Sequence, residues 1–344
     1  MLRAFFDDEG RVMQMNQAGR GWRRRAVLSG AAALLPLTGG AAATSAADLS
    51  GVVLRVGTYK GNWRALFAAA QQPAPPYTID WRELNNGTLH IEAIHADALD
   101  LGFGSEVPAL FAARQQASVR FVAAVREDLN NLVTVARGAT PIRRIADLKG
   151  RRVGYARGTI AHYFLSRQLA EAGLALADIQ SAHLAPADAL QAFVRGDIDA
   201  WAIWGYNGQL ARLQHGGRVV KTANGYASGN FPVFANPKAL ADARREAAIG
   251  DFLLRLRRAY LWANGHYLDF ARAQSAETRV AVGDLVELWN GRSTDYAVLP
   301  VGPQAVAAHQ QVADVFLQAG VLDAPARVAP LWDARYTALL ARSA

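Results

Sequence analysis

Glycines and hydroxyl residues that follow strand-like runs are best placed in this chain to bind a small molecule. Residues 56–61 (VGTYKG) and 101–108 (LGFGSEVP) each end such a run in glycines. Glycines there let backbone amides approach a ligand, and ligands of open α/β sheets lie beyond the carboxyl ends of strands. Ser105 with Pro108 is typical of a helix start, which suits an anion. A tight turn and an ordinary capped helix explain the same residues, and Glu106 would repel an anion if it faced one.

A second segment of this kind is residues 155–163 (YARGTIAHY). Gly158 predicts a turn, and a helix that begins near Thr159 presents free N–H groups, which favour negative charge by up to about 1 kcal/mol at exposed sites. The Thr159 hydroxyl and the His162 imidazole would add hydrogen-bond donors. A purely structural role for His162 is equally compatible with the sequence.

Aromatic residues follow in residues 196–206 (GDIDAWAIWGY). Side chains alternate between the faces of a strand, so Trp204 falls at the outer end of the strand with Tyr206 just beyond it. Aromatic residues at a cleft provide apolar walls for an organic ligand. We therefore expect Trp204 and Tyr206 at the ligand and Trp201 in the core.

Residue patterns that support catalysis or metal binding are absent from the sequence. It contains no G-x-S-x-G, no H-E-x-x-H and no G-x-x-x-x-G-K-[ST] pattern. The absence of cysteine excludes disulfides, thiolate nucleophiles and cysteine metal sites. His90 and His95 are five residues apart, which misses the i, i+4 spacing of a helical metal pair. We expect a binding site without catalytic residues, metal or cofactor.

The elements that must position these residues alternate between short β-rich runs and longer amphipathic runs. Strands are predicted at 52–58, 77–83, 99–103, 119–125, 131–136, 151–156, 181–185, 198–204 and 231–235. Helices are predicted at 61–70, 88–96, 107–115, 160–173, 187–195 and 207–214, and then almost continuously through 238–274, 276–290 and 303–319. This alternation indicates an α/β fold with mainly parallel sheets.

Two lobes with a cleft between them are expected. Ala139-Thr140-Pro141 marks a break after strand 131–136, and Pro232 and Pro237 flank the return. The predicted lobe I is 48–138 plus 238–344, and lobe II is 139–237. Two hinge crossings would join the lobes.

Residues 1–47 resemble an export signal rather than part of the fold. Arg23, Arg24 and Arg25 precede an Ala/Leu/Gly-rich run that continues to about Ala43. The arginine pair resembles the twin-arginine export motif. A membrane anchor is the alternative, but the run is short and Pro36 interrupts it, whereas a spanning helix needs about 20 apolar residues. We expect a periplasmic protein.

The overall charge does not indicate a nucleic-acid partner. The chain has 344 residues, a net charge of +8 and 51% hydrophobic residues, which is typical of a globular protein. Its positive charges are spread along the chain rather than clustered, as on a solvated surface. We therefore expect no nucleic-acid partner. We also expect the protein to be a monomer.

Taken in order, these motifs resemble the aliphatic sulfonate and taurine binding proteins of ABC transporters. The resemblance spans about residues 52–236. It is carried by residues 56–61, 100–108, 145–153, 158–163, 184–189 and 196–204.

The resemblance implies a type II periplasmic-binding fold that closes on an anionic ligand, most readily an aliphatic sulfonate, and serves sulfonate transport and sulfur metabolism. An ABC permease and its ATPase would be the partners. The ligand contacts carried over from the family are Tyr59, Ser105, Glu106, Gly158, Thr159, His162 and Trp204, to which the strand pattern adds Tyr206. An enzyme on the same fold, similar to desulfinases or pyrimidine-precursor synthases, and an exported sensory subunit are the alternatives.

Overall fold

Two β-sheets organise the part of the chain that the computed structural model describes, which is residues 48–114 and 118–342. These residues belong to one compact unit. The predicted export segment, residues 1–47, lies outside the described residues. Within the described ranges, no helix is both long and apolar enough to cross a membrane.

The first sheet has the strand order β11-β4-β10-β3-β1-β2. Its strands are β1 (Val53–Thr58), β2 (Thr78–Glu83), β3 (Leu101–Phe103), β4 (Arg120–Arg126), β10 (Asn230–Ala235) and β11 (Ala297–Leu299). β1 runs parallel to β2 and β3, whereas β10 is antiparallel to β3 and β4, and β11 is antiparallel to β4. The parallel strands therefore share one edge at which their carboxyl ends meet.

The second sheet has the order β7-β6-β8-β5-β9. Its strands are β5 (Leu132–Arg137), β6 (Arg152–Tyr155), β7 (Gln180–His183), β8 (Ala200–Trp204) and β9 (Gly217–Thr222). β6 is parallel to β7 and β8, and β5 is antiparallel to β8 and β9. Both sheets are therefore mixed, and the prediction of mainly parallel sheets holds only for the half of each that carries the βαβ units.

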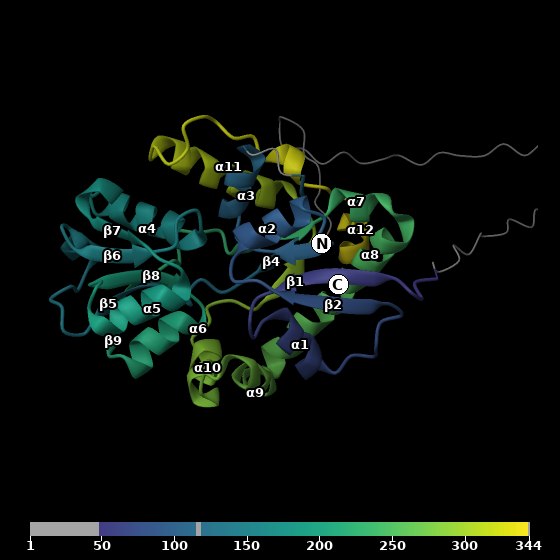
Figure 1. Ribbon diagram of the computed structural model, residues 1–344, viewed down its shortest axis with the longest axis horizontal. Helices are drawn as coiled ribbons and strands as arrows, with labels where there is room; N and C mark the ends of the chain where they lie inside the picture. Colours follow the sequence, from purple (N-terminus) through teal and green to yellow (C-terminus); the bar gives the residue numbers. More distant parts are fainter. Residues whose placement is uncertain (1–47, 115–117, 343–344) are drawn as a thin grey trace, which may run out of the picture. The chain divides into compact units, whose positions relative to one another are not determined.

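Helices surround both sheets (Figure 1). They are α1 (Trp63–Ala70), α2 (Gly87–His95), α3 (Val107–Arg114), α4 (Ile160–Glu171), α5 (Pro186–Arg195), α6 (Tyr206–Gln209), α7 (Pro237–Ala241), α8 (Ala243–Gly265), α9 (Tyr267–Thr278), α10 (Val282–Asn290), α11 (Pro303–Gln318) and α12 (Thr337–Arg342). The almost continuous helix predicted after residue 238 is divided into separate helices. One division is at Asp242, which caps α8, and another is at Arg279, which has a left-handed φ of 65° and ends α9.

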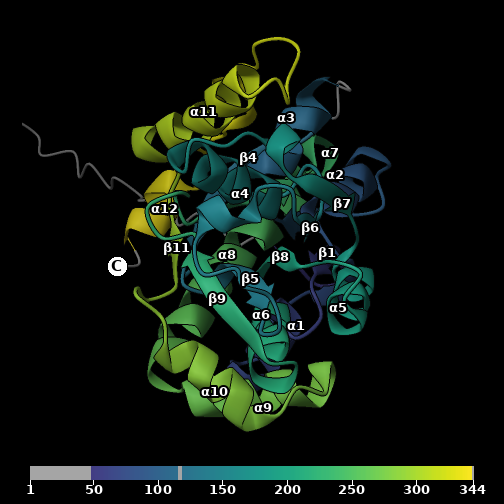
Figure 2. The ribbon, with the colours of Figure 1, turned by 90° about the vertical axis from the view of Figure 1, so that its left-hand side faces the viewer.

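The α9–α10 pair of the tail contacts the helical segment that follows β8 of the second sheet. Figure 2 shows α10 beside α9, and α10 also contacts α6, the helix that follows β8. The Gln214 amide donates to the Asp284 carboxylate at 2.9 Å, and Arg212 pairs with Glu287. This contact closes one side of the space between the sheets.

Both chain crossings between the sheets differ from the prediction. The break predicted near 139–141 would place β5 in lobe I, but β5 pairs with β8 and β9 in the second sheet. The return predicted near 232–238 would place β10 in lobe II, but β10 lies between β3 and β4 of the first sheet. The chain therefore crosses at 127–131 and at 223–229. The Glu127 N–H donates to the Gly229 carbonyl at 2.9 Å, so the crossings lie side by side.

Packing of buried side chains explains why the first crossing lies before β5 and not after it. Val133 and Val135 of β5 pack in the buried cluster of the second sheet with Trp201 and Ile203, so Trp201 is a core residue, as predicted. The Thr-Pro segment after β5 is a loop within lobe II. Two strands were not predicted: β9 carries charged residues at a sheet edge, and β11 is only three residues long.

Candidate functional site

A cavity of about 670 Å³ lies between the two sheets. Its walls include residues that directly follow β1, β2 and β3 of the first sheet and β6, β7 and β8 of the second. These wall segments are 59–62, 84–87, 156–157, 159–160, 183–187 and 204–207, together with Phe103 and Ser105. The parallel strands of both sheets thus point their carboxyl ends at one space, where ligands of open α/β sheets bind.

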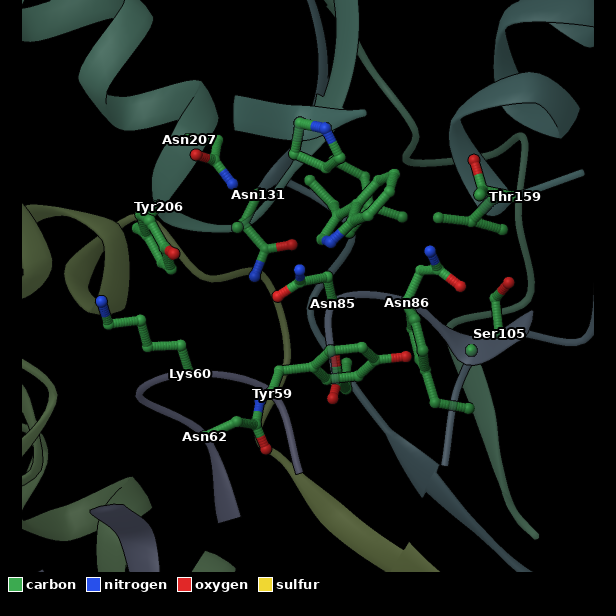
Figure 3. Close-up of a pocket in the computed structure, with 18 of the residues that line it drawn as sticks. Tyr59, Lys60, Asn62, Asn85, Asn86, Ser105, Asn131, Thr159, Tyr206 and Asn207 are labelled. Atoms are coloured by element: carbon green, nitrogen blue, oxygen red, sulfur yellow. The ribbon is translucent and has the colours of Figure 1, made fainter. Parts of the chain in front are cut away.

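Five of the residues predicted at the ligand line this cavity: Tyr59, Ser105, Thr159, Trp204 and Tyr206. Figure 3 draws Ser105 and Thr159 on one side of Tyr59 and Tyr206 on the other. The Tyr59 hydroxyl donates to the Phe103 carbonyl at 3.0 Å, which fixes the ring across the cavity wall. Contact of these residues with a ligand remains a prediction.

Ser105 is the hydroxyl residue best placed to donate to an anion. It precedes α3, its exposed fraction is 7%, and its Oγ has no hydrogen bond within the described residues. Asn86 faces the same part of the cavity (Figure 3) and caps α2 by accepting from the Leu89 N–H at 3.0 Å. The amide N–H₂ of Asn86 remains as a second donor.

The start of α4 also borders the cavity, through Thr159 and Ile160. The Thr159 hydroxyl donates to the Ala156 carbonyl at 2.7 Å, so its proton is not available to a ligand. Backbone N–H groups at the start of α4 are then left to donate in place of the predicted hydroxyl. In the part of the chain that the structure describes, no side chain caps α4 at this end. The first N–H groups of α4 are therefore donors that this lobe can offer to an anion, beside the side chain of Arg157.

Gly158 and His162 lie behind this wall rather than in it. Gly158 has a φ of 70°, which requires glycine, and its N–H donates to His162 Nδ1 at 3.4 Å. His162 is 2% exposed and stacks on Tyr155 with ring centroids 5.1 Å apart. Burial, followed by the charges of His183 and Arg157, lowers the pKa of His162 to about 4. In this geometry His162 supports the turn before α4, and direct contact of Gly158 or His162 with a ligand stays a prediction.

Glu106 points away from the cavity. It is 1% exposed, and Ser228 Oγ, on the second crossing, donates to its Oε2 at 2.8 Å. Burial raises the pKa of Glu106 to about 8. At neutral pH the group is therefore mainly uncharged, so the repulsion of an anion that the sequence suggested is removed.

A Glu106→Gln substitution is expected to stabilise the protein, and to do so more at higher pH. The pKa of Glu106 is raised in the folded state, so its contribution to stability is fully present below its ordinary pKa and is lost as pH rises through about 8. Glutamine keeps the shape and has no such loss. The melting temperature of Glu106→Gln minus that of the wild type should grow between about pH 5.5 and about pH 8.5. A constant difference would contradict this assignment.

Aromatic rings form the other walls. Tyr296 is stacked against Tyr260 with ring centroids 5.7 Å apart and lies 4.8 Å from Trp289, and all three line the cavity with Trp204 and Tyr206. Tyr260, Trp289 and Tyr296 belong to the helical tail and were not predicted as site residues. The sequence pattern marks them only as helical or loop aromatics, and nothing in it shows that the tail folds over the cleft.

Basic side chains outnumber acidic ones in the cavity wall. Lys60, Arg157 and Arg292 line it, whereas Glu127 is its single acid among the described residues. Within the same described part of the chain, no group of three or more His, Asp or Glu residues could hold a metal ion. The wall therefore suits an anion with an apolar body.

Comparisons of the sequence match this chain to known proteins. Residues 79–266 match the protein family described as NMT1/THI5 like. The chain is 31% identical over 278 residues to an aliphatic sulfonates-binding protein of Escherichia coli (strain K12), an alignment that covers 79% of this chain and 86% of that protein. It is 28% identical over 127 residues, 37% of this chain and 39% of that protein, to the taurine-binding periplasmic protein of the same organism.

Solved structures show the same fold. The alkanesulfonate-binding protein SsuA from Xanthomonas axonopodis pv. citri, bound to MOPS, matches with a TM-score of 0.75 and 26% identity, covering 83% of this chain and 99% of that one. The periplasmic aliphatic sulphonate binding protein SsuA from Escherichia coli matches with a TM-score of 0.70 and 26% identity, covering 80% and 90%. The predicted two-lobed periplasmic-binding fold is confirmed.

Proposed function

Because this chain belongs to the NMT1/THI5-like family and is similar to an aliphatic sulfonates-binding protein, we propose that it is a periplasmic solute-binding protein of an ABC transporter. In this proposal it binds an organic sulfonate between its lobes. An ABC permease and its ATPase are the partners that receive the ligand. Residues 1–47 direct export, and the protein acts as a monomer.

The observation that carries the proposal is the set of hydrogen-bond donors in the cavity wall. Ser105 Oγ comes from the first lobe and the uncapped start of α4 from the second. A sulfonate has three acceptor oxygens and no proton to donate, so donors from several directions suit it. The positive end of a helix dipole adds attraction. One anionic group held by both lobes would also favour the closed state.

Aromatic and basic residues support the same ligand class. Trp204, Tyr206 and Trp289 offer apolar surface to the organic body of the ligand. Lys60 and Arg157 add positive charge, which attracts anions to the cleft.

An enzyme on the same fold is the second candidate. The desulfurization enzyme DSZB matches with a TM-score of 0.62 and 17% identity, which shows a shared fold alone. A desulfinase of the kind that the resemblance suggests uses a cysteine, and this chain has none. We therefore propose binding without chemistry.

A thermal-shift screen of the protein, unfolded and refolded to remove any bound solute, tests the proposed function. The ligands are alkanesulfonates, MOPS, sulfate esters, carboxylates of equal chain length and neutral solutes. A ligand at about a hundred times its Kd adds about 2.7 kcal/mol to the free energy of unfolding, because it binds only the folded state. We expect melting temperatures to rise with sulfonates and to change little with neutral solutes. A rise with carboxylates alone would exclude sulfonates, and no rise with any anion would contradict the anion site.

A further inference from the structure

The contact between α10 and the segment that follows β8 joins elements that belong to different lobes. α9 is fixed to the first lobe, because the Glu277 carboxylate accepts from Arg64 Nε at 2.7 Å and from the Gly61 N–H at 2.8 Å. α10 is fixed to α9, because Trp289 Nε1 donates to Gln274 Oε1 at 3.1 Å. The α9–α10 pair is therefore part of the first lobe.

The other side of this contact, residues 206–214, is part of the second lobe. It consists of α6 and one π-helical turn, Leu210–Gln214. Ala211 of this turn is fully buried in the cluster of the second sheet that contains Val133 and Ile203. Isolated π-helical turns are rare and are often found at functional sites. The turn therefore presents its polar side chains to α10 from a fixed position on the second lobe.

Polar side chains connect the two lobes at this contact. Gln214 Nε2 donates to Asp284 Oδ2 at 2.9 Å, and Gln209 Nε2 donates to the Asp284 carbonyl at 3.3 Å. Arg212 pairs with the Glu287 carboxylate and also donates to Gln209 Oε1 at 3.2 Å. The side chains of Arg212 and Glu287 are 32% and 52% exposed. These five residues lie outside the wall of the ligand cavity, so a ligand bound there does not need to touch them.

Apolar side chains on the same elements connect the contact to the cavity. Tyr206 and Leu210 of the second lobe pack against a buried cluster of the tail that contains Ala271, Val280 and Leu285. Tyr206 and Leu285 also line the ligand cavity. The positions of these two cavity walls therefore depend on the polar contacts outside the cavity.

The contact extends away from the crossings about which the lobes would rotate. Asn130, in the first crossing, donates from its Nδ2 to the Gly291 carbonyl at the end of α10, at 3.0 Å. Glu287 and Asp284 precede Gly291 by four and seven residues, so they lie about 6 Å and about 10 Å back along the helix axis. A rotation of the lobes about the crossings therefore strains the contact most at these two residues.

We propose that these polar side chains form a latch that holds the lobes closed from outside the cavity and thereby sets the rate of ligand release. The latch consists of Gln209, Arg212 and Gln214 of the second lobe with Asp284 and Glu287 of α10. The inference rests on the proposed function for the ligand, whereas the latch itself acts with or without one. A ligand held between the lobes leaves when they separate, so each contact that must break slows its release.

Charge reversal within the latch tests it, with the release of butane-1-sulfonate as the readout. Stopped-flow tryptophan fluorescence reports occupancy, because Trp204 and Trp289 line the cavity. Arg212→Glu places two carboxylates opposite each other, so the release rate should rise at least about fivefold. Glu287→Arg should have a similar effect. The double substitution Arg212→Glu/Glu287→Arg restores an ion pair and should bring the rate back to within about twofold of the wild type.

Two further variants separate the latch from changes in net charge. Gln214→Ala removes the bond to Asp284 without adding charge and should raise the release rate at least about twofold. Arg272→Glu makes the same charge change on α9, where Arg272 pairs with Asp269 of its own helix at 2.9 Å. It should leave the release rate within about twofold of the wild type. Circular dichroism and the melting temperature check that each variant is folded.

Energy transfer between two dyes measures the latch without a ligand. The sequence has no cysteine, so Val194→Cys on α5 and Leu261→Cys on α8 provide one labelling position in each lobe. Both side chains are exposed, by 43% and 54%. In the refolded protein without ligand, the fraction of molecules with the dyes close together should fall in Arg212→Glu and recover in the double substitution, because the latch favours the closed state.

Sulfonate binding with a release rate in Arg212→Glu within about twofold of the wild type would overturn the latch and leave the proposed function intact. A faster release that the double substitution does not restore would also overturn it. If butane-1-sulfonate does not bind, the proposed function fails for this ligand. The energy transfer then decides alone: a loss of the close population in Arg212→Glu supports the latch, and an unchanged population overturns it.

Discussion

Replacing Ser105 by aspartate is expected to abolish the binding of organic anions while the protein stays folded. Ser105 lies in the cavity wall and its Oγ has no hydrogen-bond partner among the described residues, so the new carboxylate would stand where we propose that the anionic head is held. Two like charges about 4 Å apart repel by about 4 kcal/mol at an effective dielectric constant of about 20. Affinity should therefore fall at least about a hundredfold in calorimetric titration.

Matched variants separate charge from shape at this position. Ser105→Asn adds similar volume without charge and should bind more tightly than Ser105→Asp. Ser105→Ala should cost about 1–3 kcal/mol of binding free energy, because it removes one donor from a buried anion. Circular dichroism and the melting temperature check that each variant is folded. Unchanged affinity of Ser105→Asp would show that the anionic head binds elsewhere.

Trp63→Ala is expected to reduce the free energy of unfolding by about 3–5 kcal/mol. Trp63 is fully buried at the start of α1, is stacked on Phe103 with ring centroids 4.0 Å apart and donates from its Nε1 to the Tyr260 hydroxyl at 3.1 Å. Its loss leaves a cavity and an unpaired hydroxyl between β3 and α8.

Urea unfolding of Trp63→Ala measures this loss, with Leu261→Ala as the control. Leu261 is 54% exposed on α8, so its truncation should change the free energy of unfolding by less than about 0.5 kcal/mol. Similar small effects of both substitutions would contradict the central place of Trp63 in the core of the first lobe.

Strand-end motifs predicted much of the cleft because their physical basis is local. A buried apolar run that ends in glycine and a hydroxyl residue, as at Gly104 and Ser105, indicates both the strand and the position where it stops. The same rule applies after β2, where Asn85, Asn86 and Gly87 follow the strand and line the cavity, so this segment also carries a local signal of the site. Parallel pairing then brings these ends together.

The crossings could not be located from the sequence because turn residues do not distinguish a loop within a lobe from a hinge between lobes. Thr140 and Pro141 form a loop inside lobe II, whereas the actual crossing, residues 127–131, has no proline or glycine. Its assignment depends on which sheet β5 joins, and that is decided by long-range packing of Val133 and Val135.

The directions of individual side chains could not be predicted from the sequence either. Glu106 directly follows Ser105, yet Ser105 faces the cavity and Glu106 bonds to Ser228 behind it. Glu127 and Tyr296 were missed because the first lies on an unpredicted crossing and the second on a tail that folds back over the cleft. Neither position has a local pattern that marks it as part of a site.

Calorimetric titration of the refolded wild-type protein with an alkanesulfonate, followed by recovery of the ligand, is the decisive test of sulfonate binding without chemistry. We expect one molecule bound per chain with a Kd in the micromolar range or tighter, a binding free energy of about −8 kcal/mol or better. We also expect the sulfonate to be recovered unchanged after prolonged incubation. Absence of binding would contradict the assignment of the cavity to sulfonates, and release of sulfite or sulfate would show that the protein is an enzyme.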